Sequence, residues 1–335
     1  MNTYPSRVKV GVAGATGYAG QELVALLARH PGADLQIAMS SSAESAARPM
    51  PRLARIWDGA PEPLDPARLA RSVDVAFLAV PEQAAAALAP PLVDAGVRVI
   101  DLSGAFRIKD DAARSRWYPA TRTLPDGAAY GLTEHYKDRV KDATLVANPG
   151  CYPTGALLAT LPLSRAGLLD RSADVVIDAK SGISGAGRAP SERTHFSENH
   201  GSVSAYGLFT HRHVAEMEQE LATTITFVPH LVPLDRGILE TIYLRTEAGV
   251  TAERVADAFQ AAYGAEPFVR LTADALPEIK HIAWTNFCDI GWRLDAATRR
   301  LVLVVCLDNL VKGAAGQALQ NFNVACGFNE RTALL

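Results

Sequence analysis

The sequence predicts an α/β fold with a doubly wound parallel sheet in a first domain, followed by an α+β domain with a mixed sheet. Its 335 residues suffice for about two domains. Residues 7–29 have the pattern of a buried strand (RVKVGVA), a glycine-rich turn and an amphipathic helix. Strands and helices then alternate up to residue 149, which is typical of a parallel sheet, whereas the rest of the chain is rich in strands.

The first domain is expected to contain further strands at 35–39, 73–80 and 97–102. An alanine-rich helix is expected at 82–95. Five prolines between residues 44 and 71 predict an irregular insertion or a weak helix there.

The second domain is expected to contain five strands, at 173–180, 224–228, 237–245, 285–292 and 301–307. A last helix, 314–325, follows a turn signal at Lys312 and Gly313 and is expected to pack back on the first domain. We therefore expect 1–149 and 310–335 to form one domain and 150–309 the other.

Composition and charge exclude several classes of protein. Hydrophobic residues make up 48% and charged residues 21%, as in globular proteins, and a formal net charge of −3 without runs of like charge argues against a nucleic-acid partner. The uncharged segment 143–164 is long enough to cross a membrane, but its glycines and prolines would break such a helix. We interpret this segment as a strand, a turn and a helix, and expect no membrane association.

The cysteines, at 151, 288, 306 and 326, are widely spaced and form no CxxC pair. Reduced thiols in a cytoplasmic protein are therefore expected. The opening residues MNTYPSRVKV contain no apolar segment before a cleavage site, so we expect no secretion signal.

Glycines recur every third residue in GVAGATGYAG, where the first strand becomes the first helix. This pattern lets the backbone approach a pyrophosphate at a helix N-terminus and favours a dinucleotide site over a merely structural turn. No acidic residue follows the second strand to hold a ribose hydroxyl, because the sequence there is Ser40 to Ser42, with Arg48 nearby. These residues favour NADP, and the alternative for the serines is a solvated loop.

Cys151 follows Pro149 and Gly150, directly after a strand and at the start of an expected helix. A helix N-terminus stabilises a thiolate and lowers the thiol pKa, so Cys151 is the candidate nucleophile. The other three cysteines have the pattern of small core residues.

His211 and His213 lie on either side of Arg212 at the start of an expected helix. They are candidates for handling protons beside a thiolate, and the alternative is a solvated helix cap. No cysteine or glutamate pairs with them at ligand spacing, so no metal site is expected.

Two further loops follow apolar strands. The small-residue loop 180–188 can pass close to a ligand. Arg107 lies just past a strand end and could bind a phosphate, or it could form a surface ion pair.

These stretches together resemble the N-acetyl-gamma-glutamyl-phosphate reductase family of arginine biosynthesis. The resemblance covers nearly the whole chain, in the family's order and spacing, through GVAGATGYAGQEL, DLSGAFR, VANPGCYPTG, DAKSGISGAGR, THRHVAEMEQEL, FVPHLVPLDRGILETIY and DNLVKGAAGQALQN. It departs at Ala215, where the family usually has proline. Related aspartate-semialdehyde enzymes have a histidine where this chain has Ile238, which argues against that activity.

The resemblance implies a glyceraldehyde-3-phosphate dehydrogenase-like fold, with a Rossmann-type NADP-binding first domain and a catalytic and oligomerisation domain second. It also implies NADPH-dependent reduction of an acyl phosphate through a thioester on Cys151, with His213 as acid and base, in a homo-oligomer (dimer or tetramer). His211 and Glu216 are implied as substrate or orienting groups, and Arg107 as a phosphate ligand. The alternatives are a reductase of aspartyl or aminoadipyl phosphate, and a non-catalytic NADP-binding sensor.

The expected catalytic residues are Cys151, His213 and His211. The expected substrate-binding residues are Arg107, Asn148, Tyr206 and Glu216. The expected cofactor-binding residues are Gly14, Ala15, Thr16, Gly17, Tyr18, Ser40, Arg48, Ser184, Gly185 and Asn309.

Overall fold

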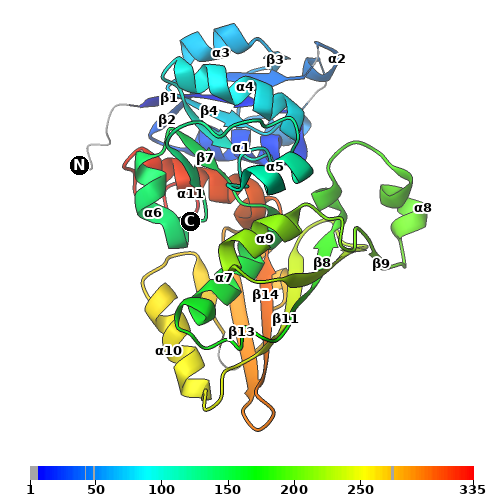
Figure 1. The fold of residues 1–335 in the computed structure, drawn as a ribbon. Helices are drawn as coiled ribbons and strands as arrows, with labels where there is room; N and C mark the ends of the chain where they lie inside the picture. Colours follow the sequence, from blue (N-terminus) through cyan, green and yellow to red (C-terminus); the bar gives the residue numbers. More distant parts are fainter. Residues whose placement is uncertain (1–6, 42, 48–49, 273–274) are drawn as a thin grey trace. The chain divides into compact units, whose positions relative to one another are not determined.

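The computed structural model describes residues 7–41, 43–47, 50–272 and 275–335 (Figure 1). The chain divides into two compact units. The first contains Met1–Gly150 and Ala314–Leu335, and the second contains Cys151–Gly313.

The first unit is built on a seven-stranded sheet in the order β3-β2-β1-β4-β5-β7-β6. Every strand pair in this sheet is parallel, which confirms the doubly wound prediction. The chain order reverses between β1 and β4, and in such sheets ligands bind at the carboxyl ends of the strands at this point. The strands are β1 (Val8–Ala13), β2 (Ala33–Ser40), β3 (Glu62–Pro63), β4 (Val75–Leu78), β5 (Arg98–Asp101), β6 (Ala128–Tyr130) and β7 (Leu145–Ala147).

Helices cover both faces of this sheet (Figure 1). One core cluster packs α1 and α11 against it through Leu23 and Phe322, and a second packs α3 and α4 through Leu69 and Leu88. The helices of this unit are α1 (Tyr18–Arg29), α2 (Ala43–Ala46), η1 (Pro51–Leu53), α3 (Pro66–Ser72), α4 (Glu82–Asp94), α5 (Asp111–Trp117), α6 (Thr133–Asp142) and α11 (Gly316–Ala325).

The second unit contains a mixed seven-stranded sheet in the order β12-β13-β14-β11-β8-β10-β9, which confirms the predicted α+β class. Pairs β8–β10 and β12–β13 are parallel and the others are antiparallel. The strands are β8 (Val175–Gly182), β9 (Ser204–Ala205), β10 (Ile225–Val232), β11 (Ile238–Arg245), β12 (Val269–Leu271), β13 (Cys288–Asp295) and β14 (Arg300–Leu307). The short edge strands β9 and β12 were not predicted.

The helical segments of the second unit pack on or extend from this sheet. They are α7 (Cys151–Arg165), η2 (Ile183–Ala186), η3 (Glu192–Thr194), α8 (Phe196–Asn199), α9 (His213–Leu221), α10 (Ala252–Tyr263) and η4 (Ile279–His281). Helix α7 is buried on all sides from Tyr152 to Leu163, which explains its lack of charge. In the part of the chain that the structure describes, no helix has the length and hydropathy of a membrane span.

The turn predicted at Lys312 and Gly313 is wrong. These residues lie in a π-helical turn, Val311–Ala315, that runs directly into α11. Lys312 is fully buried, and its ammonium lies 5.8 Å from the centre of the Phe268 ring. This cation–π contact places a residue with a surface-type side chain in the interior.

Candidate active site

The glycine-rich turn of the first unit can be made only by glycines at two positions. Gly14 has φ +90, and a Cβ there would lie 2.1 Å from the Ala79 carbonyl oxygen. A Cβ at Gly20 would lie 2.1 Å from the Gly14 oxygen. Gly17 precedes α1, which has no side-chain N-cap, and a Cβ at Gly17 would have only one neighbour, at 3.5 Å. The helix N-terminus is thus open, as pyrophosphate binding requires.

The turn is tied to the end of β2. The N–H groups of Gly14 and Ala15 donate to the Met39 oxygen at 2.8 and 2.9 Å, and Thr16 Oγ1 lies 2.9 Å from Ser40 Oγ. Because two hydroxyls stand where a carboxylate would select a ribose 2′-hydroxyl, these residues fit NADP. Tyr18, 39% exposed, begins α1, and Arg48 lies outside the described residues.

Arg107 and Asn148 lie together in the first unit. Arg107 is buried, and its Nε and one Nη donate to the carbonyl oxygens of Asn148 at 2.8 Å and Leu102 at 2.9 Å. The Asn148 side chain accepts from Asn321 at 3.0 Å and donates to the Ala314 oxygen at 3.2 Å. In this arrangement both side chains support the backbone at the end of β7.

Cys151 is the first residue of α7 and is partly exposed. The thiols of Cys288 and Cys306 are buried, and burial raises the pKa of Cys306 well above its ordinary value. Burial also raises the pKa of Cys326 to about 11. Cys151 therefore differs from the others in being partly exposed at a helix N-terminus, the setting of reactive cysteines.

Gly313, which is not among the expected site residues, packs directly against Cys151. A Cβ at Gly313 would lie 2.9 Å from Cys151 Cβ and 3.1 Å from Leu307 Cδ1. The signal was present in the stretch DNLVKGAAGQ, where glycine follows a buried strand within a few residues.

The structure brings both expected histidines to Tyr152, the neighbour of Cys151. The Tyr152 ring centre lies 5.8 Å from that of His211 and 6.0 Å from that of His213, and the two imidazoles are 4.6 Å apart. Nδ1 of His211 accepts a hydrogen bond from the His213 backbone N–H at 3.2 Å. Burial, and then the charge of Arg212, lower the pKa of His211 to about 4, so its imidazole is neutral at neutral pH.

Tyr206, an expected substrate residue, completes this cluster. Its hydroxyl lies 3.2 Å from that of Tyr152, and its ring centre lies 5.6 Å from that of His211. Burial raises the pKa of Tyr206 to about 12, so the phenol stays protonated. Glu216 is fully buried in α9, three residues after His213, and therefore on the same side of that helix.

The expected cofactor residues Ser184 and Asn309 are in direct contact in the second unit. Asn309 Nδ2 donates to Ser184 Oγ at 3.0 Å, and Asn309 Oδ1 accepts from the Gly237 N–H at 2.8 Å. A Cβ at Gly185 would lie 2.9 Å from Ser181 Oγ, so this loop is closely packed.

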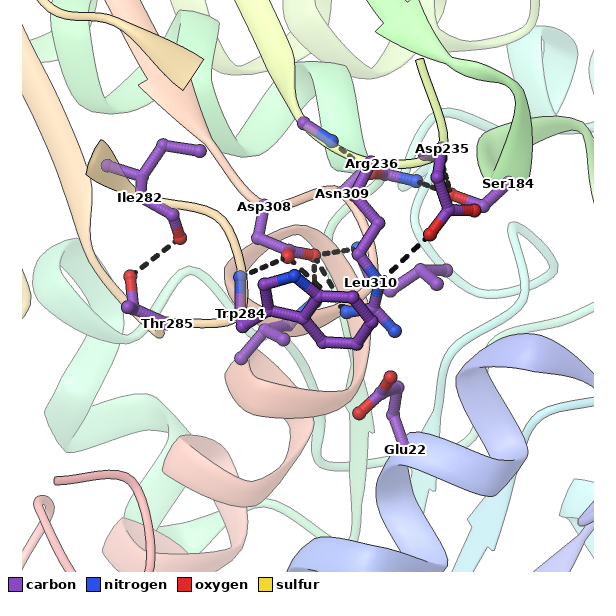
Figure 2. Close-up of polar contacts among 12 residues, drawn as sticks. Glu22, Ser184, Asp235, Arg236, Ile282, Trp284, Thr285, Asp308, Asn309 and Leu310 are labelled. Carbon is purple, nitrogen blue, oxygen red and sulfur yellow. Dashed lines mark hydrogen bonds and ion pairs between the residues drawn. The ribbon is translucent and has the colours of Figure 1, made fainter. Parts of the chain in front are cut away.

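Asp308 lies at the centre of a polar network next to the contact between Ser184 and Asn309 (Figure 2). It is fully buried, pairs with Arg236 at 3.3 Å, and accepts from the backbone N–H groups of Trp284 at 2.7 Å and Leu310 at 2.8 Å. The Arg236 guanidinium also stacks 3.5 Å from the centre of the Trp284 ring. Arg236, Trp284 and Asp308 are not among the expected site residues.

A cavity of about 810 Å³ opens beside the ring cluster. It is lined by Gly185, Ala186, Ser191, Glu192, Arg193, Thr194, Glu198, Ser204, Tyr206, His211 and Leu231. Three of these residues, Gly185, Tyr206 and His211, were expected at the site. Among the described residues, no group of three or more His, Cys, Asp or Glu side chains could hold a metal ion.

Two family models match the chain. Semialdehyde dehydrogenase, NAD binding domain, matches residues 9–143, and semialdehyde dehydrogenase, dimerisation domain, matches residues 151–309. In fold, the chain is similar to aspartate semialdehyde dehydrogenase II from Vibrio cholerae (TM-score 0.73, 19% identity, 95% of this chain and 98% of that chain). It is also similar to an aspartate semialdehyde dehydrogenase with NADP from Candida albicans (TM-score 0.71, 17% identity, 96% and 99%). The class is thus the semialdehyde dehydrogenases.

Closer relatives are N-acetyl-gamma-glutamyl-phosphate reductases. The protein of that name from Symbiobacterium thermophilum is 45% identical over 98% of this chain and 97% of its own length. The one from Bacillus subtilis is 43% identical over 98% of both chains. The chain belongs to the N-acetyl-gamma-glutamyl-phosphate reductase family.

Proposed function

We propose that the protein catalyses the NADPH-dependent reduction of N-acetyl-gamma-glutamyl phosphate to N-acetylglutamate 5-semialdehyde and phosphate, a step of arginine biosynthesis. The observation that carries this proposal is the position of Cys151 at the N-terminus of α7, next to a tyrosine packed against two histidines. The name shared by relatives that match nearly the full chain supports the choice of substrate.

Cys151 begins the reaction as the nucleophile. Its thiol proton passes to His213, the sulfur forms a bond to the acyl carbon, and the bond from that carbon to the phosphate oxygen breaks. His213 returns the proton to the departing phosphate, and a thioester remains on Cys151. The N-terminus of α7 stabilises the thiolate and provides backbone N–H groups for the oxyanion.

When bound, NADPH would supply a hydride, and the group that accepts it is the thioester on Cys151. The resulting thiohemiacetal breaks its carbon–sulfur bond, which releases the aldehyde and returns the thiolate to Cys151. A proton from solvent, handled by His213, restores the thiol.

His211 has a different role, because a pKa of about 4 leaves it without an acidic proton to give as an imidazolium at neutral pH. Its Nδ1 accepts from the His213 backbone, so the neutral ring carries its proton on Nε2. His211 thus orients His213 and can donate one hydrogen bond to substrate. Glu216 and Tyr206 are proposed to position the histidines and the substrate.

We also propose which residues bind the cofactor. Gly14, Ala15 and Gly17 shape the turn that accepts the pyrophosphate, while Thr16 and Ser40 present hydroxyls to the 2′-phosphate. Tyr18, Arg48, Ser184, Gly185 and Asn309 remain further cofactor residues of the proposal. Arg107 and Asn148 remain proposed for substrate binding, in addition to their support of the backbone at the end of β7.

The match of residues 151–309 to a dimerisation domain supports a homo-oligomer, and we propose a dimer or tetramer built through this unit. All four cysteines lie in the described part, and none forms a disulfide. Because the proposed nucleophile must stay reduced, we place the protein in the cytoplasm.

The test is phosphate-dependent reduction of NADP with N-acetylglutamate semialdehyde, compared with aspartate semialdehyde and the aminoadipate homologue. We expect activity selective for the first aldehyde. Cys151→Ser should abolish turnover while the affinity for NADPH stays unchanged. Equal activity with another aldehyde would overturn the assigned substrate, and substantial turnover by the serine variant would overturn the covalent route.

A further inference from the structure

The cavity beside His211 contains one permanently cationic side chain among the described residues that line it. That side chain is Arg193, in the short helix η3. The backbone of η3 is held by a capping box, in which the Ser191 N–H donates to Thr194 Oγ1 at 3.0 Å. Arg193 is therefore presented from an ordered turn, although its side chain is exposed.

The Arg193 guanidinium lies over the ring of Tyr206, with Cζ 5.3 Å from the ring centre. A guanidinium in cation–π contact with an aromatic ring can still bind a carboxylate with two parallel hydrogen bonds. Tyr206 connects Arg193 to the proposed catalytic groups, because its ring also contacts His211 and its hydroxyl lies beside that of Tyr152. Besides burial, a thiolate at Cys151 would raise and the Arg193 charge lowers the pKa of Tyr206, so both residues lie near its hydroxyl.

Two carboxylates, Glu192 and Glu198, line the same cavity, and His211 is neutral. The lining is therefore negative overall, and an anionic substrate group is favoured only in direct contact with Arg193. An N-acylated amino acid presents a carboxylate and an amide N–H on one carbon. Arg193 can bind the carboxylate, and a neighbouring glutamate can accept the N–H.

We propose that Arg193, in cation–π contact with Tyr206, binds the α-carboxylate of the acylated amino-acid substrate and thereby selects it. This inference rests on the proposed function, since it takes the catalytic cluster at Tyr152 and His211 to be where the acyl group reacts. It adds a specificity residue that lies outside the sequence motifs.

The experiment compares N-acetylglutamate semialdehyde with its α-carboxamide in the phosphate-dependent reduction of NADP. The wild-type protein should prefer the acid. Arg193→Gln should raise KM for the acid by about 10- to 100-fold, the loss of a charged hydrogen-bonding partner, and should leave kcat/KM for the carboxamide nearly unchanged. Arg193→Lys should recover part of the preference because it keeps the charge without the planar fork.

A second substitution, at Glu198, tests whether Arg193 acts by binding the substrate carboxylate or only by supporting the fold. In Arg193→Gln the substrate carboxylate faces Glu192 and Glu198 without a cation, so adding Glu198→Gln should lower KM for the acid again. Arg254→Gln, at an exposed arginine of α10 away from the cavity, is the matched control and should behave as wild type. Thermal melting of each variant checks that the fold is retained.

The outcomes distinguish the two proposals. If the wild-type protein does not turn over the semialdehyde, the proposed function fails. If the wild type is active and Arg193→Gln keeps the wild-type preference for acid over carboxamide, the assignment of Arg193 is overturned.

Discussion

Glu240 is a buried carboxyl group whose replacement should stabilise the protein. It lies in β11, is fully buried, and neither of its carboxyl oxygens has a hydrogen-bond partner among the described residues. It faces Gly155 of α7, where a Cβ would lie 2.6 Å from Glu240 Oε2 and 2.6 Å from Leu307 Cδ2. Burial raises the pKa of Glu240 well above its ordinary value, so the carboxyl group is protonated over a wide pH range.

The expected magnitude follows from this burial. An unsatisfied polar group in a protein interior destabilises by about 1–3 kcal/mol, so Glu240→Met, of similar length, should raise the free energy of unfolding by about that amount at a pH below the unfolded pKa, where the carboxyl group is protonated in both states, and by more at pH 7. The pKa of Glu240 is higher in the folded than in the unfolded protein. The free energy of unfolding of the wild type is therefore highest below the unfolded pKa and falls as pH rises toward the folded pKa. Between those two pKa values the loss approaches about 1.4 kcal/mol per pH unit.

The assay is urea unfolding at pH 5, 6, 7 and 8, followed by tryptophan fluorescence; Trp292 packs on Phe259 in the same unit as Glu240. The stability difference between Glu240→Met and wild type should widen as pH rises. The amide of Glu240→Gln cannot ionise, so this variant should lose the pH dependence of the free energy of unfolding. It should gain less stability than Glu240→Met because the amide is still a buried polar group. Glu253→Gln, at an exposed residue of α10, is the control. The reasoning would be refuted if Glu240→Met were less stable than wild type at every pH.

Two further predictions concern the proposed catalytic cluster around Cys151 and His211. Gly313→Ala inserts a methyl group 2.9 Å from Cys151 Cβ. It should therefore lower kcat at least tenfold and destabilise the protein by about 1–3 kcal/mol. Unchanged kinetics would contradict this prediction. Burial and the charge of Arg212 lower the pKa of His211 to about 4. Its contribution to the free energy of unfolding is therefore present above the unfolded pKa of about 6.5 and is lost as pH falls toward 4. The total loss is roughly 3 kcal/mol. His211→Asn should show a smaller loss of stability over this range in acid unfolding curves, and an unchanged acid transition would show that His211 titrates normally.

Local chemistry made much of this protein predictable. The strand, glycine turn and helix at its start follow from a periodicity of apolar residues and from glycines that the backbone needs at Gly14 and Gly20. The neighbouring Pro149 and Gly150 likewise indicate that a helix begins at Cys151. The role of Cys151 stays a prediction, as do the roles of His211 and His213.

Other features depend on contacts between distant residues. The turn signal at Lys312 and Gly313 was overridden because Phe268 gives the ammonium a buried partner and Cys151 packs where a side chain would extend. Asp308 pairs with Arg236 from a distant strand end. Neither side chain carries a local signal for this pairing.

The class of each unit, the glycine-rich turn and the candidate nucleophile can be predicted from the sequence, because these depend on residues adjacent along the chain or on a repeated pattern. Tertiary structure decided which rings surround Tyr152, why His211 is neutral, and which cation lines the cavity beside it. Burial and electrostatic reach depend on distance in space, and Arg193 of η3, Tyr206 after β9 and His211 before α9 become neighbours only when these elements pack together.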